Sequence, residues 1–407
     1  MFSVADLFAG CGGLSHGFVH TGFFAVVLGL DNDRDALTTF EHNHRRSGSD
    51  PLILDGDIRK WSPREIASSL APWELNSPGQ LDVLVGGLPC EGFSQNKRLE
   101  LIDASGMRSF TRNPLDSTDP RNMLFRYFLA VAAELRPKVV VIENVPQMLT
   151  AGRGRFAAEL QKTLMRLDYR VTTRVLLAAD YGVPQLRKRA IVVGTRMPLA
   201  PFQWPTATHS MDPIGTRSLF GSDMHSYVTV GDAIRDLPRP TSEEEGIKPV
   251  SAYPHLGESL SAFARTMRSA LGTPMNHVYR VPGEMVLTRL RAMQPGMRAS
   301  ELPASLRPKS HYYNCYGRLQ WDQPAKTITK SCNYLGSGCF GHPVEDRGIT
   351  MREAARLQSF EDDFAFLSRS EPHVAKMVGS AVPPLLASAI ARQVVRCLQP
   401  SVGEGSR

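Results

Sequence analysis

The chain has 407 residues, of which 42% are hydrophobic and 21% charged, with a formal net charge of +7 at pH 7. This length accommodates a large α/β domain plus a smaller one, and the composition is ordinary for a soluble globular protein. We expect neither a secretory signal nor a membrane-spanning segment, and the mild positive charge alone does not identify a nucleic-acid-binding protein.

Strand-like and helix-like segments alternate through the first half of the chain. Repeated strand–helix units predict an α/β fold with a doubly wound, mostly parallel sheet and helices on both faces. A helical pattern also follows the glycine-rich residues 10–13. The expected strands are residues 2–8, 23–30, 81–85, 138–142, 170–177 and 190–194, and the expected helices are residues 34–44, 122–135 and 156–167.

The composition changes near residue 200, where the chain becomes rich in Pro, Gly, Ser and Arg. Scattered aromatic residues there favour a separate irregular module over a disordered insert. Helical patterns return at 350–360 and 373–398, and the last residues are expected to fray. The predicted division is a first domain at 1–199, a smaller module at 200–316, a return to the first domain at 317–400 and a flexible tail at 401–407.

Six cysteines are scattered along the chain without CxxC spacing, which argues against a zinc site and against a disulfide framework. We therefore expect a reducing cytoplasmic setting and no bound metal. A free thiol in that setting can act as a nucleophile. The cysteines are Cys11, Cys90, Cys315, Cys332, Cys339 and Cys397.

The sequence DLFAGCGGLSHGF at residues 6–18 follows the first expected strand. Its glycines let the backbone turn and approach a ligand, although their spacing is not GxGxxG. The next strand ends at Asp31, whose carboxylate can accept from both hydroxyls of a ribose, and Asp57 can hold an adenine amino group while Ile58 packs on the ring. The glycine-rich turn and the turns at Asp31 and Asp57 could each be an ordinary turn at the end of a strand. Together, in this order, they favour a cofactor that contains adenosine.

The sequence LDVLVGGLPCEGFSQNKR at residues 81–98 places a cysteine just after a short buried strand. Gly86 and Gly87 let the chain turn, Pro89 stiffens the approach, and Cys90 is presented at the strand end. A polar loop extends from there to about residue 113. An isolated cysteine is more often a core residue, so this motif needs its neighbours to be interpreted.

Several motifs, in the same order along the chain, resemble those of the DNA (cytosine-5)-methyltransferase family of bacterial restriction–modification systems. DLFAGCGG is similar to the family's cofactor loop, and GGLPCEGFS is similar to its catalytic loop GGPPCQGFS. The other matching motifs are ENV at 143–145, QLRKR at 185–189, RLQWDQPAKTIT at 318–329, REAARLQSF at 352–360 and VGSAVPP at 378–384.

The resemblance implies a Rossmann-like class I methyltransferase that uses S-adenosylmethionine, with S-adenosylhomocysteine as product. Carbon 5 of cytosine is a weak nucleophile until a thiolate adds at carbon 6, so Cys90 is the implied attacking group. Glu143 would bind ring nitrogen 3 and the amino group, and Arg187 and Arg189 would donate to the base carbonyl and to Cys90 or a phosphate. The target base must leave its stack, at a cost of about a few kcal/mol.

The resemblance also implies binding residues. Substrate contacts fall on Ser94, Asn144, Val145 and Gln185, and no metal ligand is implied. Cofactor contacts fall on Phe8, Ala9, Gly10, Cys11, Gly12, Gly13, Asp31, Asn32, Asp57, Ile58, Pro89, Leu124, Ser380 and Ala381.

Three positions depart from the commonest family pattern. Leu88 replaces a proline, Glu91 a glutamine and Ser380 an asparagine. A carboxylate at Glu91 would disfavour the thiolate of Cys90 and repel phosphate. None of the three removes a reacting residue.

By the same resemblance, residues 200–316 form a target-recognition domain, and the chain acts as a monomer on double-stranded DNA in the cytoplasm. Arginines in 289–318 can read guanine or simply cover the surface. A cognate restriction nuclease or defence-system proteins are further expected partners. Three alternatives stay open: a methyltransferase of the same family acting on tRNA, a non-catalytic DNA-binding regulator, and a nicotinamide oxidoreductase, which the glycine pattern disfavours.

Overall fold

The computed structural model describes residues 1–89, 99–102, 108–111, 123–212, 224–242, 253, 260–268, 273–308, 315–368 and 370–399. Cys90, Glu91, Ser94 and the predicted tail at 401–407 lie outside these described residues.

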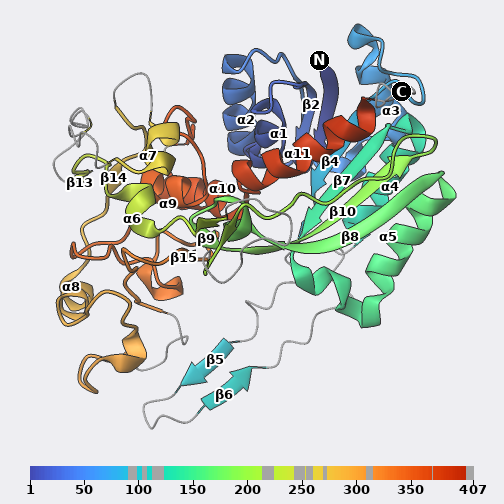
Figure 1. Cartoon of the computed structure of the whole chain (residues 1–407). Helices are drawn as coiled ribbons and strands as arrows, with labels where there is room; N and C mark the ends of the chain where they lie inside the picture. The colour runs from blue at the N-terminus through green and yellow to red at the C-terminus, as the bar shows by residue number, and fades with distance from the viewer. Residues whose placement is uncertain are drawn as a thin grey trace.

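A seven-stranded sheet forms the centre of the fold, in the order β3-β2-β1-β4-β7-β10-β8 (Figure 1). Its strands pair in parallel from β3 to β7, whereas β10 is antiparallel to both β7 and β8. This is the mostly parallel α/β sheet that the sequence predicts. The strands are β1 (Phe2–Leu7), β2 (Phe24–Asp31), β3 (Leu52–Asp55), β4 (Val83–Gly87), β7 (Val139–Asn144), β8 (Tyr169–Leu177) and β10 (Lys188–Arg196).

Helices cover both faces of the sheet. Val83 and Val85 pack in the core beneath α1, α2 and α11, while Leu84 between them packs on the opposite face. This alternation follows from the two-residue period of a strand. One face is covered by α1 (Gly13–Val19), α2 (Arg34–Arg46) and α11 (Pro384–Leu398), and the other by α3 (Pro63–Ser69), α4 (Leu124–Leu135) and α5 (Arg155–Arg166).

The region from 373 to 398 is not one helix, as its pattern predicts, but two. Helix α10 (Glu371–Ser380) ends before Pro383, and α11 begins at Pro384. Two consecutive prolines interrupt the helical hydrogen-bond ladder, and proline is well tolerated in the first turn of the new helix.

This stretch also corrects the expectation that no segment is apolar enough to span a membrane. By length and composition residues 371–398 qualify, because an 18-residue window within them has a mean hydropathy of 1.5, but 72% of that window is buried inside the protein. The apolar side chains of α11 pack against α1 and the sheet, and those of α10 pack in a second core, which accounts for the composition.

Helix α3 and strand β3 are elements that the sequence-based prediction omits. Ser62 and Glu65 form a capping box at the start of α3, and Pro63 occupies its first turn. That combination is a recognisable signal for a helix start. Strand β3 has four residues, which are too few for an apolar pattern to be recognised.

The chain between the sheet and α10 forms a second lobe with little regular structure (Figure 1). Its helices and strands are short. They are α6 (Val230–Ile234), α7 (Ala262–Met267), α8 (Glu284–Arg291), α9 (Met351–Leu357), and the strand pairs β11 (His209–Ser210) with β12 (His225–Ser226) and β13 (Thr241–Ser242) with β14 (Val278–Tyr279). Strand β15 (Ala325–Lys326) pairs with β9 (Gln185–Leu186), which precedes β10 in the chain. A further pair, β5 (Leu99–Ile102) with β6 (Arg108–Thr111), belongs to the segment between β4 and α4.

One hydrophobic core joins the parts of this lobe that precede and follow residue 316. Val230 and Leu290 share it with Ile328 and Phe360. The buried guanidinium of Arg356 adds charged hydrogen bonds to Asp362 and Asp236. The predicted boundary after residue 316 stays a prediction, and the hydrophobic core is continuous across it.

Candidate active site

A cavity of about 400 Å³ lies at the carboxyl ends of the parallel strands. It opens where the strand order reverses between β1 and β4, which is where ligands bind in open α/β sheets. The volume is within the usual range for a small-molecule site. All of the predicted cofactor residues except Gly12 line it, as do Glu143, Val145, Arg187 and Arg189.

The turn after β1 brings the backbone close to the cavity. Phe8 adopts a left-handed φ of 60°, which is uncommon for a bulky residue and typical of ligand-binding turns. Gly13 lines the cavity, and a Cβ atom there would lie 2.5 Å from the carbonyl oxygen of Val382. Glycine at this position therefore lets the closing motif pack directly on the start of α1.

Gly12 packs against α2, and its predicted contact with the cofactor stays a prediction. It precedes α1 with a φ of 94°, and a Cβ atom would meet His44 and Phe40 at 2.9 Å. The residue therefore permits the packing of α2 on the turn, and it does not line the cavity.

Two acidic residues, Asp31 at the end of β2 and Asp57 just after β3, lie beside the cavity. The carboxylate of Asp31 accepts the backbone N–H groups of Gly10 at 2.8 Å and Asp33 at 2.9 Å. Each oxygen keeps a second lone pair for a ligand hydroxyl. Burial raises the pKa of Asp31. Asp57 begins a short helical turn, and its hydrogen bond with Arg59 holds the pKa of that carboxyl below its ordinary value.

Glu143 and Arg189 form an ion pair at the opposite end of the cavity. The Nε atom of Arg189 lies 2.6 Å from Oε1 of Glu143, and their side chains are only 12% and 8% exposed. The backbone carbonyl of Glu143 accepts the N–H of Leu88 at 3.2 Å. This bond holds the segment that leads into Cys90 beside the Glu143 carboxylate.

The side chain of Asn144 also bonds to the segment that leads into Cys90. Its amide donates to the carbonyl of Leu88 at 3.3 Å and accepts from the N–H of Val145 at 2.7 Å. Asn144 is buried and is not part of the cavity wall, so the structure gives it a positioning role beside the predicted substrate contact at Val145.

Arg187 and Gln185 connect the sheet to the closing motifs. The buried guanidinium of Arg187 donates to the carbonyls of Ile328, Gly379 and Ala381 at 2.9–3.0 Å. Arg187 borders the cavity, but these bonds use both of its terminal nitrogens, which favours a positioning role over the predicted direct donation to the base.

Gln185 is fully buried and does not reach the cavity either. Its amide group donates to the carbonyl of Leu357 and to the side chain of Gln358, and its oxygen accepts the N–H of Ile328. The sequence motif thus fixes the relative positions of segments that lie far apart along the chain.

Several cavity residues were missed by the sequence-based analysis. Asp6, near the end of β1, is buried against the cavity, and burial raises its pKa to about 7. Its place within the glycine-rich motif was a signal that could have found it. Lys330 and Lys376 also line the cavity, and Lys376 pairs with Asp33 at 2.7 Å although 343 residues separate them.

The sheet order, with a single antiparallel strand near one edge, and the cavity at the strand ends define a Rossmann-like methyltransferase fold. A solved structure with this fold, a prophage-encoded E. coli chain assigned to the DNA modification methyltransferases, superposes with a TM-score of 0.70 at 22% identity, covering 98% of this chain and 99% of that one.

The family follows from sequence. Residues 2–396 match the model of the C-5 cytosine-specific DNA methylases, and the chain belongs to that family of methyl-transfer enzymes. The type II methyltransferase M1.HphI of Haemophilus parahaemolyticus is 30% identical over 96% of this chain and 86% of its own length. The type II methylase M.HgiDII of Herpetosiphon aurantiacus is 30% identical over 98% and 96%.

Proposed function

We propose that this protein methylates carbon 5 of a cytosine within a specific sequence of double-stranded DNA, with S-adenosylmethionine as methyl donor. The observation that carries the proposal is the buried Glu143–Arg189 pair, held against the segment that leads into Cys90 at the mouth of the strand-end cavity. The names of the type II relatives support a DNA substrate and a modification role.

The cavity residues fit the proposed donor. Asp31 has acceptor capacity for ribose hydroxyls, and Ile58 and Phe8 supply apolar surface. The Asp57 carboxylate, which would accept an adenine amino group, is shared with the guanidinium of Arg59. When bound, S-adenosylmethionine supplies an electrophilic methyl group on a positively charged sulfur.

Catalysis begins with attack of the Cys90 thiolate on carbon 6 of an extruded cytosine. Glu143 donates a proton to ring nitrogen 3 as the new S–C bond forms, so that carbon 5 gains electron density and takes the methyl group. Loss of the carbon 5 proton to water, departure of the Cys90 thiolate and return of the nitrogen 3 proton to Glu143 then restore the aromatic ring. Arg189 orients the Glu143 carboxyl throughout, while its Nη1 group donates to the backbone carbonyl of Lys188.

The direct test measures transfer of labelled methyl groups from S-adenosylmethionine to duplex DNA and, in parallel, to tRNA. We expect transfer to duplex DNA and none with Cys90→Ser. A covalent adduct with oligonucleotides containing 5-fluorocytosine, mapped to Cys90 by mass spectrometry, would support the thiolate mechanism. Methylation of tRNA alone would overturn the proposed substrate, and full activity of the Cys90→Ser variant would overturn the mechanism.

We further propose that the protein acts in the cytoplasm as a monomer on DNA and protects host sites from a cognate nuclease. Bisulfite sequencing of host DNA, with and without the expressed protein, would reveal the modified cytosine and its flanking sequence. Random positions of methylation, without a shared sequence context, would contradict a type II modification role.

A further inference from the structure

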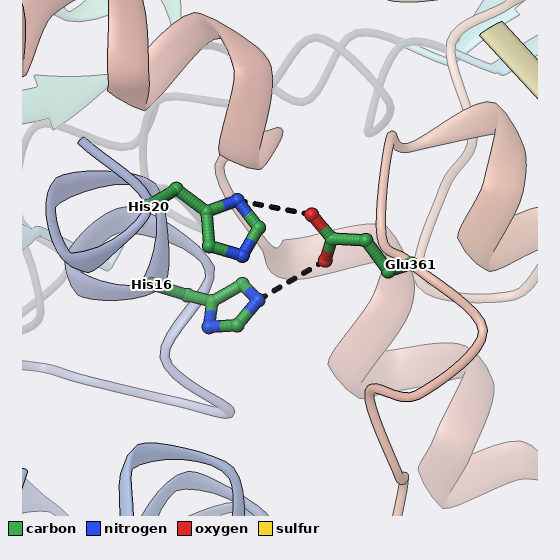
Figure 2. Close-up of side chains that lie close together, drawn as sticks. All are labelled: His16, His20 and Glu361. Carbon is green, nitrogen blue, oxygen red and sulfur yellow. Dashed lines mark hydrogen bonds and ion pairs between the residues drawn. The ribbon is translucent and has the colours of Figure 1, made fainter. Parts of the chain in front are cut away.

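We propose that His16, His20 and Glu361 form a binding site for a divalent transition-metal ion, and that Zn²⁺ is the ion their chemistry fits. The two histidines lie one turn apart at the end of α1, and Glu361 lies between α9 and α10. Figure 2 shows both imidazole rings directed at the two oxygens of the carboxylate. None of the three residues lines the cavity described above.

The cluster has dimensions close to those of a metal site. Nε2 of His16 lies 3.2 Å from one oxygen of Glu361, and Nδ1 of His20 lies 2.9 Å from the other. One ligand atom from each residue can be chosen so that all three lie within 4.8 Å of one another. Tetrahedral zinc with bonds of about 2.0–2.1 Å separates its ligand atoms by about 3.3 Å, so small side-chain rotations suffice.

The ligand types suit a transition metal better than Mg²⁺ or Ca²⁺. Two imidazoles with one carboxylate are a recurrent zinc ligand set, whereas the alkaline-earth ions prefer oxygen ligands throughout. Histidines four residues apart on a helix present both rings on one face.

The surroundings allow an ion to enter from one side. The side chain of His16 is only 7% exposed, and its ring packs edge-on against Phe364 with centroids 4.8 Å apart. Glu361 and His20 are 23% and 29% exposed, so water can reach the cluster and serve as a fourth ligand. The absence of CxxC spacing, on which the expectation of no metal rests, does not bear on a site without cysteine.

An ion at this position would act as a structural clamp. Helix α1 directly follows the glycine-rich turn, and Glu361 follows the segment in which Gln358 bonds Gln185 and the carbonyl of Val378. The metal would therefore join the N-terminal half of the cavity to the closing motif. We expect binding to raise the melting temperature of the whole chain, because only the folded state assembles the three ligands.

The test uses the full chain after removal of metals with a chelator. Zn²⁺ is titrated against a chromophoric competitor, and thermal unfolding is followed with Zn²⁺ or Mg²⁺ present. We expect one Zn²⁺ per chain at submicromolar Kd, a melting temperature higher by several degrees, and no effect of Mg²⁺. His20→Gln and Glu361→Gln should each weaken binding at least 30-fold. The matched control, His42→Gln, removes an exposed histidine of α2 outside the cluster and should leave binding unchanged.

Two results would overturn the proposal. Zn²⁺ binding that survives both cluster substitutions would place the ion elsewhere, and binding weaker than about 10 μM in the unaltered protein would leave only a hydrogen-bonded ion pair. If the variants fail to fold, the unaltered protein is treated with diethylpyrocarbonate, which modifies histidine, with and without Zn²⁺. Protection of His20 by Zn²⁺ would support the site, and lack of protection would overturn it. These readouts do not measure methyl transfer, so their failure would leave the proposed function intact.

Discussion

Arg189 and Glu143 share a short ion pair of 2.6 Å between neighbouring antiparallel strands, with both side chains largely shielded from water. The pair is therefore oriented before any substrate arrives. Preorganised charged groups of this kind stabilise charge that develops during a reaction more strongly than mobile ones do. Its position beside the segment that leads into Cys90 connects the fold directly to the proposed chemistry.

Replacing Glu143 with Gln preserves the shape of the side chain but removes the transferable proton. We expect kcat for DNA methylation to fall by about 10²–10⁴-fold, the usual contribution of a general acid. Cofactor affinity should change less than threefold. The control is Lys162→Ala, which changes an exposed residue of α5 that does not line the cavity. Single-turnover kinetics that match the unaltered protein would rule out the proton-transfer role of Glu143.

Substitution of Arg187 should act on stability. Arg187→Met keeps much of the volume but leaves three carbonyl oxygens without their guanidinium donors. We expect a loss of about 3 kcal/mol or more in the free energy of unfolding, measured by urea denaturation. Lys188→Met, at the exposed neighbouring position, should change it by no more than about 0.5 kcal/mol. Equal stabilities of the two variants would refute the connecting role of Arg187.

Asp31 should contribute to cofactor binding. Asp31→Ala removes the acceptor that we assign to the ribose hydroxyls, and hydrogen bonds to a charged group are worth about 1.5–3 kcal/mol each. We expect the Kd for S-adenosylhomocysteine, measured by calorimetry, to rise at least tenfold. Asp55, which occupies the equivalent register position on β3, is exposed and provides the matched control. A similar loss with Asp55→Ala would argue against a specific contact.

Burial of Asp6 should make stability depend on pH. Because the folded protein raises the pKa of Asp6 from 3.8 to about 7, the protonated form is favoured by folding. Its stabilising contribution is complete below about pH 4 and is lost as the pH rises through 7. Relative to Asp6→Asn, the unaltered protein should therefore lose stability between pH 4 and pH 8. Parallel stability curves for the two proteins over that interval would contradict the shift.

Gly13 should be intolerant of a side chain. Gly13→Ala would place a Cβ atom 2.5 Å from the Val382 carbonyl, which belongs to the backbone and cannot rotate away. We expect a loss of about 1–3 kcal/mol from this overpacking, together with weaker cofactor binding. Gly283→Ala, where a Cβ atom meets nothing within 4 Å, should be close to neutral. Thermal unfolding of both variants distinguishes a steric cause from a general effect of replacing glycine.

Much of the fold could be predicted because its signals are local. Strand β4 and strand β7 appear as runs of valine, leucine and isoleucine, and α5 has a clear helical period. The division of the C-terminal stretch into α10 and α11 was also written in Pro383 and Pro384, although the continuous apolar pattern obscured it. Helix α9 falls within the helical pattern predicted at 350–360, whereas α6, α7 and α8 escaped prediction because packing, rather than periodicity, stabilises such short helices.

By itself, the sequence determined the strand–helix order, the glycine-rich turn, the acidic strand ends and the motif series that identifies the family. Only the tertiary structure decided that Arg187, Gln185 and Asn144 position backbone segments, and that His16 and His20 meet Glu361 from 345 and 341 residues away. The reason is physical. Backbone preferences act between near neighbours, whereas the partner of a buried polar side chain is chosen by the packing of distant segments, which no local pattern records.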